Sequence, residues 1–220
     1  MTLAMAPPKR IRDRPRTETR ILDALGAILL DDGFGAIGVN AVAARAGVDK
    51  VLIYRYFGGF DGLLAAFARH ADLWWSVDDL VGDHLAPPDD DSFAGWIALI
   101  LRRHVAELSD RPLARAVIAW EAVARNPLTE AVARLRAERS FAVMAAVVAR
   151  AGPGGARAGP IVAVLSAALE HLLLRGATFD DWLGLDLASE AGWQRIDAAI
   201  GDIARAAFTT RAGSMNPESF

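Results

Sequence analysis

Hydrophobic positions along the chain recur at helical spacing. Apolar side chains fall three or four positions apart between residues 17 and 30, and the same spacing returns in five later segments, 61–75, 93–108, 111–125, 126–150 and 189–208. A nearly continuous apolar run occupies residues 160–175, which predicts a helix buried on several sides. Alternating strand patterns of any length are absent, so the sequence predicts an all-α fold.

Polar residues mark where several of these helices should begin. Thr17 is the expected N-cap of the first helix, and Asp91 or Ser92 that of the helix over 93–108. Asn126, which precedes a proline, suits the start of the long helix that follows. These positions predict an N-terminal head of three helices and a longer helical body.

Residues 41–57, AVAARAGVDKVLIYRYF, have the pattern of a helix-turn-helix. Ala43 permits close approach of two helices, Gly47 suits a left-handed turn, and Ile53 provides a buried anchor. Asp49 is the expected N-cap of the second helix. The free surface of that helix then combines hydrogen-bond donors with apolar groups, which suits DNA: Lys50, Val51, Leu52, Tyr54, Arg55 and Tyr56.

Charge is divided unevenly along the 220 residues. The first 60 carry nine basic and six acidic side chains, whereas the remaining 160 carry 15 basic and 21 acidic ones. The overall charge of −3 would argue against a general nucleic-acid binder, but this asymmetry is typical of a DNA-binding head on an acidic body. The chain has no cysteine, which excludes disulfides and thiolate metal sites and is compatible with the cytoplasm.

The predicted organisation has four parts. Residues 1–16 form a disordered basic arm, 17–60 the helix-turn-helix head, 61–210 the helical body for ligand binding and dimerisation, and 211–220 a disordered tail. The arm is either a DNA contact or a solvated tail. A signal peptide is a poor interpretation of the N-terminus, and no stretch approaches the roughly 20 apolar residues that span a bilayer. We therefore expect a cytoplasmic protein with no membrane partner.

Residues 17–69 resemble the TetR/AcrR family of bacterial transcriptional regulators. The matching residues are Phe34, Val42-Ala43, Ala46-Gly47-Val48, Ile53-Tyr54-Arg55-Tyr56-Phe57 and Leu63-Leu64. The resemblance implies a homodimeric repressor or activator whose two heads bind a palindromic double-stranded DNA operator. It also implies that the body binds a small molecule, here a largely apolar effector, whose binding shifts the first turn of the helix over 61–75 and separates the heads.

The resemblance carries over to particular DNA contacts. Lys50, Tyr54 and Tyr56 match positions that contact bases or phosphates, whereas Gly38 and Phe60 replace a capping threonine and a lysine. We expect apolar base contact and the arginine-rich arm to compensate for the phosphate contacts that are lost. The complete candidate set is Arg14, Arg16, Gly38, Arg45, Lys50, Val51, Leu52, Tyr54 and Tyr56.

Aromatic residues in the body supply the candidate effector site. The helices between residues 93 and 150 line the pocket in the proteins that this chain resembles, which gives the set Trp96, Ile100, His104, Trp120, Glu121, Phe141 and Met144. His104 and Glu121 are the polar groups expected to orient a ligand. The alternative is that these side chains form the apolar core of the body.

The last two helices supply the candidate dimer interface. Packed against their copies they would make a four-helix contact, with the expected residues Leu165, Leu169, Leu172, Ile196, Ile200 and Ile203. The alternative is that these helices complete the core of the protomer.

An enzyme is the competing class of function. The sequence contains no HExxH, phosphate-binding glycine loop or Gly-x-Ser-x-Gly motif, and Glu170 and His171 diverge on a helix. We therefore expect no catalysis, no metal site and no cofactor. A ligand-independent DNA-binding adaptor is the second alternative, in which the body only dimerises.

Overall fold

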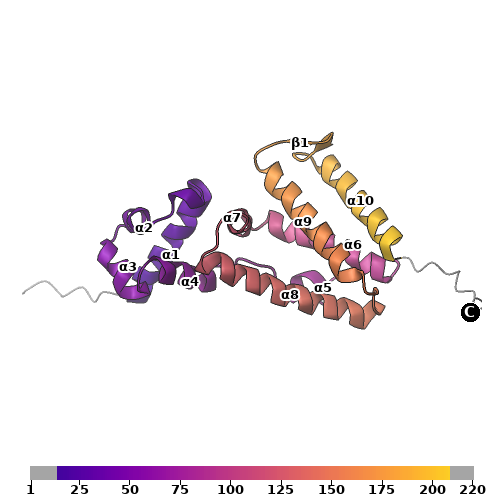
Figure 1. The fold of residues 1–220 in the computed structure, drawn as a ribbon, viewed down its shortest axis with the longest axis horizontal. Helices are drawn as coiled ribbons and strands as arrows, with labels where there is room; N and C mark the ends of the chain where they lie inside the picture. The colour runs from indigo at the N-terminus through magenta and orange to yellow at the C-terminus, as the bar shows by residue number, and fades with distance from the viewer. Residues whose placement is uncertain (1–13, 209–220) are drawn as a thin grey trace, which may run out of the picture. The chain divides into compact units, whose positions relative to one another are not determined.

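The computed structural model describes residues 14–208, and within this range it contains ten α-helices, one 3-10 helix and one short hairpin (Figure 1). The predicted all-α fold class is confirmed. The described chain divides into two compact units. The first unit comprises residues 14–72 and 116–131, and the second comprises residues 73–115 and 132–208.

The first unit is built on four helices at the N-terminal end of the described chain. They are α1 (Arg14–Asp31), α2 (Val39–Ala46), α3 (Lys50–Phe57) and α4 (Phe60–His70), with a 3-10 turn, η1 (Phe34–Ala36), between the first two. The end of α7 (Pro112–Glu121) and the start of α8 (Pro127–Ala151) belong to the same unit. Fully buried side chains from all four helices form its core: Ile21, Leu25, Val42, Ile53, Leu63, Leu64 and Phe67.

Two predicted helix bounds in this region are wrong. The first helix begins at Arg14, so Thr17 lies inside its first turn and is not its cap. Pro15 is tolerated there because the first turn of a helix needs no internal N–H partner at that position. The helix expected over 61–75 ends at His70, because Ala71 adopts extended dihedral angles, φ −84 and ψ 140.

The second unit starts with a short irregular segment that holds the buried residues Leu73, Trp74 and Trp75. Its elements are α5 (Val77–Val81), α6 (Phe93–Ser109), the first part of α7, most of α8, α9 (Ala158–Gly176) and α10 (Glu190–Phe208). Helix α6 packs against both α9 and α10. Ser92, one of the two caps that the sequence predicted, caps α6 by accepting a hydrogen bond from Gly95 N–H at 3.0 Å.

A two-stranded hairpin separates α9 from α10. Strand β1 (Asp181–Trp182) pairs antiparallel with β2 (Leu185–Asp186). The sequence predicted only a turn in this region. The strands are two residues long, too short to show the alternation of apolar and polar positions that marks a strand.

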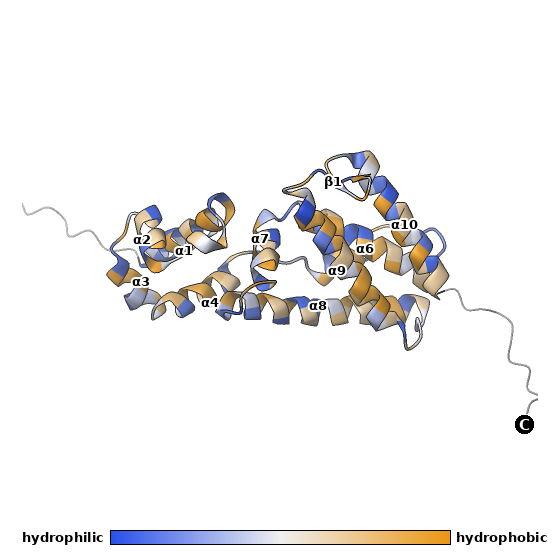
Figure 2. Ribbon diagram, turned by 45° about the horizontal axis from the view of Figure 1, so that its top comes forward, coloured by the Kyte–Doolittle hydropathy of each residue, from blue (hydrophilic) through white to orange (hydrophobic). Residues whose placement is uncertain are grey.

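Helix α9 is apolar along most of its length (Figure 2). Among the described residues it is the one helix that is long and apolar enough by itself to cross a membrane, and α3 with α4 would qualify only as a single span bent by 70°. Apolar helices of this length also occur inside proteins. Only Ala158, Leu165 and Leu169 of α9 are buried, so the expectation of a helix buried on several sides is wrong for the protomer. Glu170 on α9 forms an ion pair with Arg136 on α8, so one side of α9 packs within the second unit while another is an exposed apolar face.

Candidate functional site

The turn between α2 and α3 has the geometry that the sequence predicted. Gly47 is left-handed, with φ 62 and ψ 42, and the N–H of Val48 donates to the carbonyl of Ala43 at 3.0 Å, which closes a Schellman turn. Asp49 caps α3, since its carboxylate accepts a hydrogen bond from Val51 N–H at 2.9 Å. These contacts fix the direction in which α3 leaves the turn.

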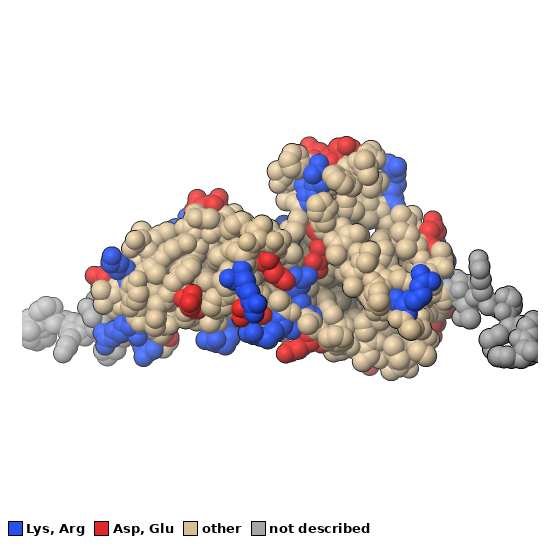
Figure 3. Space-filling model, viewed as in Figure 1, with Lys and Arg blue, Asp and Glu red and all other residues tan. Residues whose placement is uncertain are grey.

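Helix α3 buries one residue fully and exposes four of the others. Ile53 is fully buried in the core of the first unit, whereas Lys50, Val51 and Tyr54 are exposed and Leu52 is half-buried. The exposed residues lie at spacings of one, three and four positions, so they share one side of the helix. This face combines a cation, an apolar group and a phenol. Figure 3 shows lysine and arginine side chains gathered at the end of the first unit where α3 lies.

The start of α1 lies beside the end of α3. The guanidinium of Arg14 stacks over the ring of Tyr56 at 5.1 Å from its centroid, and its Nε donates to Glu18 at 2.7 Å. The stacking on Tyr56 connects Arg14 to α3, and the pair with Glu18 orients the guanidinium along its own helix. The arm was predicted over residues 1–16; Arg14 and Arg16 lie in α1, and the rest of the arm, residues 1–13, lies outside the described residues, as does the tail over 211–220.

Arg45 is engaged within the head. Its guanidinium forms ion pairs with Asp31 and Asp32 at the end of α1 and just beyond it. These pairs connect α2 to α1. The two aspartates also compensate the positive charge of Arg45, which is therefore less available to bind a DNA phosphate. Gly38 is the N-cap of α2 and has no side-chain hydrogen bond, so its backbone alone is available for contact.

The candidate effector residues do not all fall in one unit. Trp120 and Glu121 belong to the first unit, where Trp120 stacks on Phe34 at 5.8 Å between ring centroids. The other five candidates belong to the second unit. Phe141 is 77% exposed there, whereas Ile100 and His104 are buried one helical turn apart on α6. Trp96 is also buried on α6, and Met144 is half-buried on α8.

His104 is the centre of a buried polar cluster. Trp75 Nε1 donates to His104 Nδ1 at 2.8 Å, so the imidazole carries its proton on Nε2, which lies 3.2 Å from Glu170 Oε1. Arg136 Nη2 donates to both oxygens of Glu170 at 2.7 and 2.8 Å. Burial alone raises the pKa of Glu170, but the hydrogen bond from His104 and the charge of Arg136 together lower it below its ordinary value.

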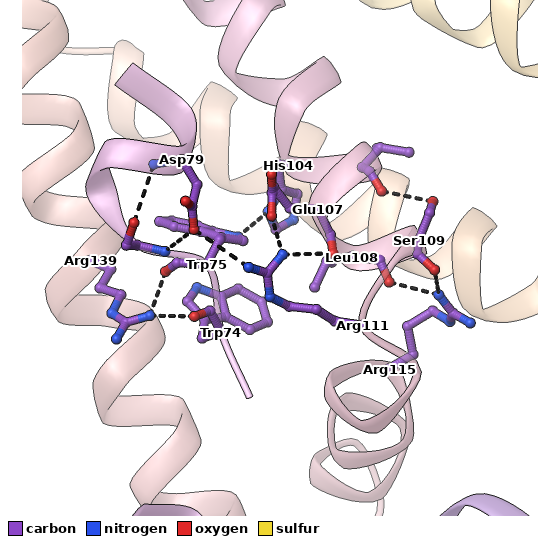
Figure 4. A network of polar contacts seen from close by, with 12 residues as sticks. Trp74, Trp75, Asp79, His104, Glu107, Leu108, Ser109, Arg111, Arg115 and Arg139 are labelled. Carbon is purple, nitrogen blue, oxygen red and sulfur yellow. Dashed lines mark hydrogen bonds and ion pairs between the residues drawn. The ribbon is translucent and has the colours of Figure 1, made fainter. Parts of the chain in front are cut away.

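A second set of contacts holds the irregular segment in front of α5 (Figure 4). Arg139 on α8 donates to the backbone carbonyls of both Trp74 and Trp75, the latter at 2.6 Å. Arg111 pairs with Glu107 and lies 3.5 Å from Asp79 of the capping box at the start of α5. The carbonyls of the two tryptophans are thus bound by a side chain of α8 instead of by backbone N–H groups of a helix of their own, which explains why α4 need not continue to residue 75.

The sequence did not single out Trp74, Arg136 or Glu170 as members of a site. Glu170 was considered only with its neighbour His171, yet its histidine partner is His104, 66 residues earlier in the chain. The one available sign was the presence of a glutamate within the apolar run over 160–175. Among the described residues, no group of three histidine or acidic side chains is placed to hold a metal ion.

Four candidate dimer residues are buried inside the protomer. Leu165 and Leu169 of α9, and Ile196 and Ile200 of α10, face its core, while Leu172 is half-buried and Ile203 is exposed. The exposed apolar surface of these helices comes mainly from other positions: Ala163, Val164, Ala167, Ala168, Ala199, Ile203 and Ala206. The periodicity located the helices, but it did not separate their inner faces from their outer ones.

Comparison with known proteins places this geometry in a family. The family described as "Bacterial regulatory proteins, tetR family" matches residues 21–67. The HTH-type transcriptional regulator BetI of Burkholderia thailandensis is 28% identical over 178 residues, which cover 78% of this chain and 89% of the relative. An HTH-type transcriptional repressor of Streptomyces coelicolor is 30% identical over 95 residues, which cover 43% of this chain and 46% of the relative.

A solved structure has the same fold. The crystal structure of the multidrug binding protein EbrR complexed with imidazole superposes with a TM-score of 0.55 and 20% identity, and the match covers 96% of this chain and 100% of the other. The curated relatives are named as transcriptional regulators or repressors, and the matched region contains the helix-turn-helix. These matches support a transcriptional regulator of the TetR family, in which the helix-turn-helix is the DNA-binding element.

Proposed function

We propose that the protein is a homodimeric repressor that binds a palindromic operator and releases it when a small effector binds the second unit. The observation that carries this proposal is the exposed face of α3, where Lys50, Val51 and Tyr54 lie together. The turn at Gly47 and the Asp49 cap hold this face in a fixed direction, as a helix that enters the major groove requires. The Streptomyces coelicolor relative, named as a repressor, supports that role.

The proposed contacts divide by chemistry. Lys50 and Tyr54 can donate hydrogen bonds to phosphates or base edges, and Val51 can make only apolar contact, as with a thymine methyl group. Tyr56, near the end of α3, and Arg14, which stacks on it from α1, suit a phosphate. Gly38, Leu52 and Arg16 remain candidates, whereas Arg45 is better assigned to the contact between α1 and α2.

Selection of bound sequences from random DNA tests the operator. We expect two identical half-sites in inverted orientation, because a two-fold dimer presents its α3 helices symmetrically. A selected sequence with one half-site only, or no enrichment at all, would contradict the model of a dimer on a palindrome.

The dimer proposal rests on the exposed apolar face of α9 and α10. Val164 on α9 is 68% exposed, although it lies in the middle of the most apolar helix of the chain. Val164→Glu would place a charge in this face, and we expect sedimentation to change from twice the 23.5 kDa protomer mass to a single protomer. Val123→Glu is the matched control, because Val123 is 69% exposed but lies in the first unit.

The response to effector is proposed as a shift between two conformations of the dimer. An effector that binds the second unit more tightly in the DNA-free conformation lowers operator affinity in proportion to that difference. A thermal-shift screen of small apolar compounds tests this response. A uniformly flat result, with operator binding intact, would instead support the ligand-independent adaptor.

A further inference from the structure

Two neighbouring indoles of the second unit differ in their hydrogen bonding. Trp74 and Trp75 are equally buried, at 2% and 3% exposed. Trp75 Nε1 donates to His104 at 2.8 Å. Trp74 Nε1 is also buried, but it has no hydrogen-bond acceptor among residues 14–208. A buried N–H donor without an acceptor destabilises a protein, so this atom calls for an explanation.

The surroundings of Trp74 are otherwise well paired. Its ring lies 5.4 Å from that of Trp75 and 5.7 Å from that of His104, and the guanidinium of Arg136 stacks over it at 4.8 Å. The side chains of Trp75, His104, Arg136 and Glu170 all have partners within the cluster. The cluster thus combines three aromatic rings with one unpaired donor. Ile100, buried one turn before His104 on α6, adds an apolar group on the same side of that helix.

Arg136 and Glu170, the ion pair of the cluster, compensate each other. Glu170 accepts two hydrogen bonds from Arg136, and their opposite charges offset each other. His104 accepts from Trp75 through Nδ1, so its ring is neutral in this arrangement. A charged ligand would find Arg136 and Glu170 already paired with each other and Arg139 bound to the carbonyls of Trp74 and Trp75, and burying an unpaired ion is costly. An uncharged ligand avoids that cost.

We infer that Trp74 Nε1 is the hydrogen-bond donor of an effector subsite, and that the effector is an uncharged, largely apolar molecule with a carbonyl oxygen or a similar acceptor. Trp74, Trp75 and His104 provide its aromatic surroundings, and Arg139 fixes the backbone that carries both tryptophans. The inference rests on the proposed response to an effector, and it specifies the chemistry that the effector must have.

Indole N–H resonances test the inference directly. The probes are two uncharged ketones, acetophenone and benzophenone, with benzoate and benzyltrimethylammonium as charged aromatic counterparts. The Trp74 cross-peak in a ¹H–¹⁵N spectrum is assigned by its loss in Trp74→Phe. We expect at least one ketone to shift this peak, and its affinity to fall roughly three- to tenfold in Trp74→Phe, since one hydrogen bond is lost. Neither charged probe should shift the peak.

The ligand-free protein supplies a matched comparison. Trp74→Phe keeps an aromatic ring and removes an unpaired N–H, so its Tm should equal or exceed that of the native protein. Trp75→Phe removes a paired N–H and leaves His104 Nδ1 without a donor. We expect its Tm to fall by roughly 3 °C or more.

Other results would overturn the inference. If Trp74→Phe is as destabilising as Trp75→Phe, the Trp74 donor is already satisfied without a ligand. If neither ketone shifts the Trp74 peak, or a charged probe shifts it instead, the subsite or its preference for uncharged molecules is wrong. Selection of operator sequences does not depend on these outcomes, so the subsite inference can be wrong while the proposed DNA binding is right. A compound that raises Tm without shifting the Trp74 peak would place the effector site elsewhere.

Discussion

Replacing Arg136 by methionine would leave the Glu170 carboxylate buried without its cation. The side chains of this pair are 21% and 12% exposed, and Arg136 Nη2 lies 2.7 and 2.8 Å from the two carboxylate oxygens. Removing one partner of a buried ion pair costs roughly 3–5 kcal/mol. The remaining hydrogen bond from His104 and the partial exposure place this case at the lower end, about 3 kcal/mol, or on the order of 10 °C in Tm.

The pKa of Glu170 determines how the cost of Arg136→Met changes with pH. In the native protein the pKa of Glu170 is lowered, so the stabilisation by the pair is present above the pKa of the unfolded state and is lost as pH falls through the folded-state pKa. In Arg136→Met, burial acts without the arginine charge, and the folded-state pKa rises. The penalty is then relieved as pH falls, so the difference in unfolding free energy between the two proteins should shrink from pH 7 to about pH 4.

Urea unfolding at a series of pH values measures both effects. Arg102→Met is the matched control, because Arg102 pairs with Asp197 at 2.8 Å while their side chains are 58% and 35% exposed. It should cost less than about 1 kcal/mol. Adding Glu170→Gln to Arg136→Met removes the unpaired charge and should restore about 1 kcal/mol or more. An Arg136→Met protein within about 0.5 kcal/mol of the native one at every pH would refute the reasoning.

Three further predictions concern the first unit. Lys50→Gln should lower the slope of log operator affinity against log salt concentration by about 0.9 per half-site. Arg45→Gln should leave that slope unchanged, because Arg45 is paired with aspartates. Equal slopes for the two variants would contradict the assignment of Lys50, and not Arg45, to a phosphate. In a competition assay, Tyr54→Ala should weaken binding to all DNA sequences, whereas Val51→Ala should change which operator sequence is preferred. A uniform loss of affinity in both variants would show that Val51 carries no base specificity. Asp49→Ala should cost about 1 kcal/mol in urea unfolding and Asp49→Asn much less, because asparagine also caps; similar losses would exclude a capping role.

Local patterns predicted the parts of the fold that depend on neighbouring residues. The apolar spacing located the helices, Gly47 marked the left-handed turn, and Asp49 and Ser92 marked the helix starts. Ile53 was correctly predicted as the buried anchor of α3. Each of these features is determined within a few positions along the chain, where side-chain periodicity and capping act directly.

Features that depend on distant residues were missed. The ion pairs of Arg45 depend on residues 13 and 14 positions earlier, and the Glu170 pairs on residues 34 and 66 positions earlier. The end of α4 was misplaced because its periodic pattern continues through Trp74, whose carbonyl is bound by Arg139. Spacing along one helix cannot reveal which partner a charge or carbonyl finds across the fold.

The division of the chain into units also limits how the protein can be cut. The first unit takes residues from both 14–72 and 116–131, so the backbone passes between the units three times. A fragment ending at residue 72 would lack Trp120 and would uncover the face of Phe34 that stacks on it, although Phe34 is already 38% exposed. An isolated DNA-binding fragment, or a chimaera that exchanges this region between regulators, would therefore need both segments to recover the native packing.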